Sequence, residues 1–112
     1  MSTIPTQNPP RVPPAESAEQ KLRRLEALWL TDTEFLSDAR RIIDHPAFRQ
    51  IVLLGREVVP VLLRDLQAKP SLLVWALPEM TGANPVPPAD AGNIRKMSDA
   101  WVRLGQAQGI LR

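Results

Sequence analysis

The chain of 112 residues has no cysteine, no tyrosine and a single histidine. Without cysteine there can be no disulfide, thiolate nucleophile, zinc–thiolate site or iron–sulfur cluster. The longest unbroken apolar run covers residues 72–77, far short of the ~20 residues that a membrane-spanning helix needs. The first residues also lack the basic and apolar stretches of a secretory signal. We therefore expect a cytoplasmic protein with no membrane partner.

A surplus of one charge sign is missing as well, because 14 Lys and Arg face 12 Asp and Glu, a net charge of +2. The two signs are interspersed along the chain. The high isoelectric point of about 9.7 reflects the shortage of groups that titrate near neutrality. Binding to phosphate backbones relies on clustered positive charge, so the charge pattern disfavours a nucleic-acid partner.

Proline, in contrast, is abundant: the chain has 12, about twice the usual ~5%. Five of them lie within the first 14 residues, which predicts a flexible tail over residues 1–16 with polyproline II bias. The segment from Pro9 to Pro14 contains a PxxP pattern around Arg11, of the kind that SH3-like grooves bind. A proline-rich tail matches so short a pattern easily, so whether it is a docking motif stays open.

Residues 17–105 are predicted to form a single α-helical domain. Ser17 and Gln20 have the spacing of a capping box, so a first helix is expected from Ser17 to about Leu30. Thr31 and Glu34 repeat this spacing and predict that a second helix begins at once. Its inward stripe would have the strongest helical period in the chain: Phe35, Leu36, Ala39, Ile42 and Ile43.

Prolines and glycines mark the next helices. A short third helix should begin at Pro46 and end at Gly55, and a fourth should begin near Glu57 with Pro60 in its first turn. A fifth is expected over residues 72–81, ended by Gly82. Within it, Pro78 should clash with the carbonyl of Val74 and produce a kink or an early end.

A last helix is expected from about Asp90 to Leu104, ending at Gly105, with residues 106–112 as a fraying C-terminal end. The preceding segment, residues 83–89, contains three prolines and should be an extended loop. No segment alternates with a period of two. We predict an all-α fold: a compact bundle of about five to six short antiparallel helices with no sheet.

Residues 48–82 resemble the two-helix unit of HEAT-like repeats, over one to one and a half units. In that family an apolar helix ends in Leu-Gly, and the next helix opens with a polar stretch, a Val-Pro pair and a leucine-rich face. The matching residues are Leu54, Gly55, Val59, Pro60, Leu62, Leu63 and Leu66. The resemblance implies HEAT-like helix pairs and a role in protein–protein contact, since the family mostly supplies scaffolds and adaptors.

Candidates for catalysis are few. His45 could serve as a general base, but the sequence Asp44-His45-Pro46 is better explained as a junction where Asp44 or His45 caps the next helix. Glu34 and Asp38 share a helix face, yet Arg41 turns that row into a salt-bridged surface. No glycine-rich phosphate loop occurs. We expect no enzyme, no catalytic residue, no metal site and no cofactor.

Nucleic-acid binding has two weak indications. A helix-turn-helix around Gly55 fits poorly, because Ile51 replaces the usual small residue, Arg56 the usual apolar one, and Pro60 would interrupt the recognition helix. The other is a basic patch of Arg40, Arg41 and Arg49, although such arginines more often pair with neighbours, here Asp38 and Asp44.

The three tryptophans, Trp29, Trp75 and Trp101, lie on or beside apolar stripes, which favours core packing. The alternative is that Trp75, next to Pro78, is an exposed interface anchor.

Together these observations predict a non-enzymatic protein–protein interaction module, a small prokaryotic adaptor or regulatory partner. The alternative is a small nucleic-acid-binding regulator or antitoxin-like protein. The candidate partner-binding residues are Trp75, Pro78, Arg40, Arg41 and Arg49. Neither the partner protein nor the oligomeric state is specified by the residues.

Overall fold

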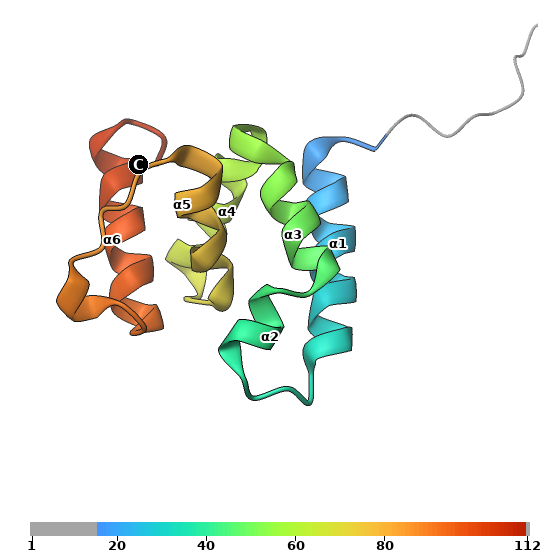
Figure 1. Ribbon diagram of the computed structural model, residues 1–112. Coiled ribbons are helices and arrows are strands. Elements are labelled where there is room, and N and C mark those ends of the chain that lie inside the picture. The colour runs from blue at the N-terminus through green and yellow to red at the C-terminus, as the bar shows by residue number, and fades with distance from the viewer. Residues whose placement is uncertain (1–15, 112) are drawn as a thin grey trace, which may run out of the picture.

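The computed structural model describes residues 16–111, and the expected proline-rich tail with its PxxP stretch lies almost wholly outside them. The fold is all-α, as predicted, and residues 16–111 contain no strand. In Figure 1, α1 and α6 stand at opposite sides of the bundle, with α3, α4 and α5 between them. The α-helices are α1 (Ala18–Thr33), α2 (Ala39–Ile43), α3 (Pro46–Leu53), α4 (Val59–Ala68), α5 (Leu77–Thr81) and α6 (Ile94–Ala107). Short 3-10 helices cover Gly55–Val58, Leu72–Ala76 and Pro88–Asp90.

One continuous hydrophobic core joins these helices. Within it, α1 packs mainly on α3, and α4 packs mainly on α6. Between the two pairs lie the side chains of the 3-10 helix Leu72–Ala76 and of α5. Trp29 and Phe48 meet in a tilted arrangement, with ring centroids 5.2 Å apart and planes at 51°. Such an aromatic pair contributes about 0.5–1.5 kcal/mol beyond the area it buries. Trp29 and Trp101 are both buried in this core.

The first helix begins as predicted and ends later. The side chains of Ser17 and Gln20 form both bonds of the capping box. However, α1 continues to Thr33, so the expected second helix from Thr31 is wrong. The hydroxyl of Thr33 is buried and donates to the carbonyl of Trp29 at 2.6 Å. Residues 34–38 form a loop, and α2 begins only at Ala39.

The turn between α3 and α4 follows the sequence prediction closely. Gly55 has a φ of 72°, a conformation that favours glycine, directly after the C-cap of α3. The chain then makes the 3-10 turn Gly55–Val58, so α4 starts at Val59, two residues after the expected Glu57. Pro60 lies in the first turn of α4, where its missing N–H costs no helical hydrogen bond.

Pro78 neither kinks a long helix nor clashes with Val74. The segment Leu72–Ala76 is a 3-10 helix, and the N–H of Leu77 donates to the carbonyl of Val74. At Leu77 the chain changes to the α-helix α5, which places Pro78 in a first turn. Where the sequence predicts a kink or an early end, the chain instead changes from a 3-10 helix to an α-helix. Gly82, with a φ of 74°, ends α5 as predicted.

The C-terminal boundary differs from the prediction. Helix α6 starts at Ile94, capped by Asn93, and passes through Gly105 to Ala107. Gly105 is buried against α4, and its carbonyl accepts from the N–H groups of Ile110 and Leu111 at 2.8 and 3.1 Å. Leu111 is buried in the core. Instead of fraying, residues 106–111 fold back onto the bundle.

Candidate functional site

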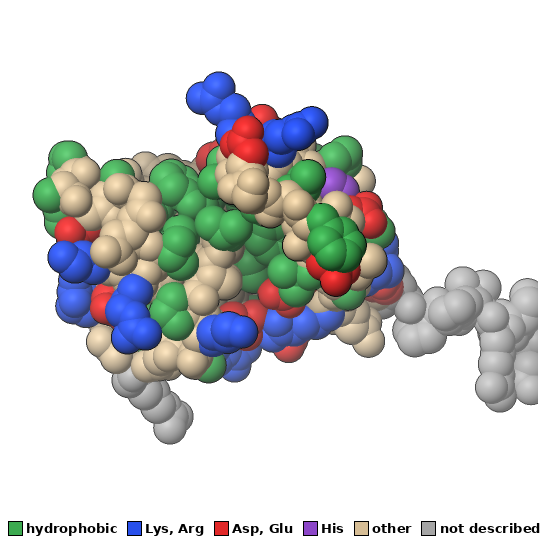
Figure 2. Space-filling view, turned by 90° about the horizontal axis from the view of Figure 1, so that it is seen from below, with side chains coloured by type: hydrophobic (Ala, Val, Ile, Leu, Met, Phe, Trp, Pro, Cys, Tyr) green, Lys and Arg blue, Asp and Glu red, His purple; other side chains and the backbone are tan. Residues whose placement is uncertain are grey.

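Apolar side chains collect on the lower face of the molecule, where α1 ends and α2 begins. Figure 2 shows them as a band across this face, with Lys and Arg side chains around its margins. The loop 34–38 lies at the bottom of Figure 1 and belongs to this face. It carries Phe35, which is 92% exposed, and Leu36, while Leu30 in the last turns of α1 is 55% exposed. We call Leu30, Phe35 and Leu36 the lower apolar cluster.

A groove of about 390 Å³ opens beside this cluster, between α1 and the segment that joins α4 to residues 72–73. Leu30 lines it together with Trp29, Leu72 and Leu73. Charged groups stand at its rim: the guanidinium of Arg23 binds both carboxylate oxygens of Asp65, at 2.6 and 3.0 Å. That hydrogen bond raises the pKa of Arg23 further above its ordinary value. An apolar floor with a polar rim is the usual composition of a surface that takes up a partner's side chain.

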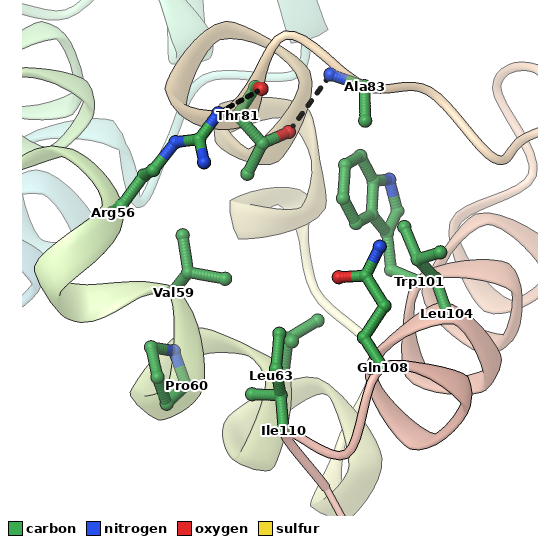
Figure 3. Close-up of a pocket in the computed structure, with 11 residues that line it drawn as sticks. Arg56, Val59, Pro60, Leu63, Thr81, Ala83, Trp101, Leu104, Gln108 and Ile110 are labelled. Atoms are coloured by element: carbon green, nitrogen blue, oxygen red, sulfur yellow. Dashed lines mark hydrogen bonds between the residues drawn. The ribbon is translucent and has the colours of Figure 1, made fainter.

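A second cavity, of about 270 Å³, lies between α4 and α6 and is shown in Figure 3. Aliphatic residues and Trp101 form most of its wall, and Arg56 closes one end by donating to the carbonyl of Thr81 at 3.0 Å. The Thr81 hydroxyl in turn accepts from the N–H of Ala83 at 3.1 Å. The polar groups of this wall thus tie the 3-10 turn Gly55–Val58, α5 and the following loop together, a structural role.

The predicted basic patch is divided by the structure. Arg49 binds the carboxylate of Glu79 in α5 through two bonds of 2.9 and 2.6 Å. Hydrogen bonding to Arg49 holds the pKa of Glu79 below its usual value. Arg40 and Arg41, on α2, are exposed and form no ion pair with another of the described residues. Their expected partner Asp38 instead accepts from the backbone N–H of Arg40, capping α2.

The other predicted residues lie within the bundle. Trp75 is half-buried and packs against the core, and Pro78 is half-buried in α5. His45 caps α3, as its junction predicted: Nδ1 accepts from the N–H of Ala47 at 3.0 Å. Its Nε2 lies 3.0 Å from Asp32 Oδ2. Structural contacts therefore occupy both ring nitrogens.

The lower apolar cluster was missed by the sequence prediction, which placed Phe35 and Leu36 on the buried stripe of a helix. Both lie in a loop instead. The available signal was Asp38, a good N-cap residue directly before Ala39. Taken as the start of α2, it leaves residues 34–37 outside any helix.

No protein-family model, curated protein or solved structure matches this chain. No helix of residues 16–111 has both the length and the hydrophobicity required to span a membrane. Within the same residues, no group of three or more His, Asp and Glu is placed to hold a metal ion.

Proposed function

We propose that this protein is a cytoplasmic, non-enzymatic interaction module, a small adaptor or regulatory partner, and that it binds another protein through the lower apolar cluster. The observation that carries the proposal is Phe35, almost fully exposed on a loop and accompanied by Leu30 and Leu36. Burying one such side chain in a partner contributes about 1.5–3 kcal/mol. Apolar patches rimmed by charge are typical of protein-binding surfaces.

The resemblance of residues 48–82 to HEAT-like repeats supports the same class of function. Gly55, with its positive φ, and Pro60, in the first turn of α4, are the residues on which this support rests. Trp75 and Pro78 are only partly buried and would form a second contact area of the proposed module.

The test compares two exposed apolar residues on different elements. Leu53, on α3, is 82% exposed and serves as the matched control for Phe35. A photo-crosslinking amino acid is placed at position 35 or at position 53, and the protein captured from the native cell extract is identified and purified. Its affinity for the Phe35→Ser and Leu53→Ser variants is then measured by calorimetry.

We expect capture at position 35 and a loss of affinity of at least about tenfold in Phe35→Ser, the equivalent of ~1.4 kcal/mol of lost burial. Leu53→Ser should bind normally, and both variants should unfold at the native temperature, since neither side chain is buried. Equal affinity of the two variants, or capture at position 53 alone, would contradict the proposed surface.

The alternative, a nucleic-acid-binding regulator, is favoured by one observation: Arg40 and Arg41 on α2 have no carboxylate partner among residues 16–111 and are close in sequence to the exposed Phe35. Cations next to an aromatic ring are a usual arrangement for single-stranded nucleic acid. Fluorescence anisotropy with labelled single- and double-stranded DNA at rising salt tests it. Binding that persists at physiological salt and disappears in the Arg40→Gln, Arg41→Gln double variant, but not in an Arg64→Gln control, would replace the protein-binding proposal.

A further inference from the structure

The junction between α2 and α3 holds the only histidine of the chain in two hydrogen bonds. His45 is the N-cap residue of α3, and its Nδ1 lies 3.0 Å from the backbone nitrogen of Ala47. The opposite ring nitrogen, Nε2, lies 3.0 Å from Oδ2 of Asp32, in the last turn of α1. One imidazole ring therefore ties the start of α3 to the end of α1.

These contacts determine where the ring proton resides. The backbone N–H of Ala47 can only donate, so Nδ1 of His45 must offer its lone pair. A neutral imidazole then has its proton on Nε2, and this N–H donates to the carboxylate of Asp32. The structure thus assigns the Nε2–H tautomer of the neutral ring.

We propose that protonation of His45 removes the cap of α3, which makes this junction a pH-sensitive switch. The added proton resides on Nδ1, facing the N–H of Ala47, and two donors cannot form a hydrogen bond. The new positive charge also lies at the N-terminus of α3, where the helix dipole disfavours cations. The bond from Nε2–H to Asp32 strengthens instead, so the ring stays on α1 and releases α3.

The charged groups of the surrounding elements leave Asp32 as the partner of the ring. On α2, Arg41 and Asp44 are exposed, and neither forms an ion pair with His45. On α3, Arg49 is held by Glu79 of α5. The His45 side chain is 19% exposed, so protons from solvent reach it.

Release of the cap affects the segment before α3, which includes the loop that carries Phe35 and Leu36. Helix α2 in this segment has only five residues; none is fully buried, and Ile42 and Ile43 are partly buried against the core. Its contacts with the rest of the fold include the bond from the Trp29 indole N–H to the Ile42 carbonyl, at 2.7 Å, and its covalent link to α3 through His45. Loss of the cap would therefore increase the mobility of α2 and of the loop before it. This inference is independent of the proposed function.

The experiment is a pH titration of the full ¹⁵N-labelled chain by NMR, from about pH 8 to pH 5, the range in which a histidine side chain ordinarily changes its charge. The ring ¹⁵N shifts should report the Nε2–H tautomer at the alkaline end. As the ring titrates, the Ala47 amide resonance should move with the same midpoint. Its hydrogen-exchange protection, corrected for the intrinsic pH dependence, should fall about fivefold, which corresponds to a cap worth ~1 kcal/mol.

Two variants separate the cap from the ion pair. In His45→Asn the new side chain caps α3 at every pH and does not titrate, so the Ala47 amide should stay unchanged. In Asp32→Asn the contact between Nδ1 and the Ala47 N–H is left in place, so the response of the Ala47 amide to protonation of the ring should persist. An Nδ1–H tautomer at the alkaline end, an Ala47 amide that ignores the titration of the ring, or a His45→Asn variant that responds like the native protein would each overturn the proposal.

Discussion

Gly105 offers the sharpest test of how α6 packs against α4 and the C-terminal segment, because the sequence predicts a helix terminator there and the structure shows a buried helical residue. A Cβ atom at this position would lie 2.9 Å from Cδ1 of Leu63 and 3.2 and 3.3 Å from Cδ1 and Cγ of Leu111. Carbon atoms in comfortable contact are about 3.5–4.0 Å apart. The substitution Gly105→Ala therefore requires the side chains of Leu63 and Leu111 to move from their packed positions.

Two opposing terms determine the size of the effect. Overpacking of a core usually costs about 1–3 kcal/mol, whereas alanine is about 1 kcal/mol better than glycine inside a helix. We expect a net loss of ~1 kcal/mol, which lowers the melting temperature of a domain of this size by about 4–8 °C. Thermal unfolding followed by circular dichroism measures it.

Repeating the substitution in a Leu63→Val background identifies the cause. Valine lacks the Cδ1 atom of the closest contact, so there Gly105→Ala should have almost no effect or raise the melting temperature. Gly82→Ala is the control. Gly82 has a φ of 74° and no atom near the position of a Cβ, so this substitution should lower the melting temperature by the same amount in both backgrounds. If Gly105→Ala lowers the melting temperature equally in both backgrounds, as expected for a helix terminator with positive φ, the packing argument is refuted.

Three further predictions concern other parts of the fold. Ser17→Ala removes the side-chain acceptor for the Gln20 N–H and should cost about 1 kcal/mol in urea unfolding, while a wild-type midpoint would show that the box is not formed. Phe48→Ala should cost about 3–5 kcal/mol because the ring is fully buried against Trp29, and a loss below that of Phe48→Leu would contradict this packing. Glu79→Gln should lower the free energy of unfolding at pH 7 by at most about 1 kcal/mol. Since the folded pKa of Glu79 is depressed, this gap should be present above pH 4.5 and close as the pH falls below it, and a gap that persists in acid would exclude the ion pair as its cause.

Where sequence prediction succeeded, the interaction lies within a few residues. The capping box of Ser17, the proline at the start of α3 and the positive φ of Gly55 and Gly82 all involve neighbouring backbone groups. Backbone N–H and C=O groups at helix ends need hydrogen-bond partners wherever the helix lies in the fold. The all-α class, the starts of α1 and α3 and, within two residues, the start of α4 could be predicted for this reason.

Where it failed, a distant contact outweighed the local pattern. Thr31 and Glu34 have the same spacing as the capping box at Ser17, yet α1 continues through Thr31 to Thr33. The longer helix buries Thr33, and the indole N–H of Trp29, one turn earlier, donates to the Ile42 carbonyl of α2. Neither gain is visible in a window of a few residues. The candidate surface was missed with it, because this error placed Phe35 and Leu36, two of its three residues, in a helix.

The amino-acid sequence by itself determined that the chain forms helices, where α1 and α3 start, and that disulfide and thiolate chemistry are excluded. The tertiary structure alone decided which apolar residues are buried. Phe35 and Phe48 are the two phenylalanines of the chain; one is exposed to solvent and the other lies in the core. Likewise Gly82 ends a helix and Gly105 continues one. In each pair the residue type is the same, and the difference comes from the neighbours that the fold brings within contact distance.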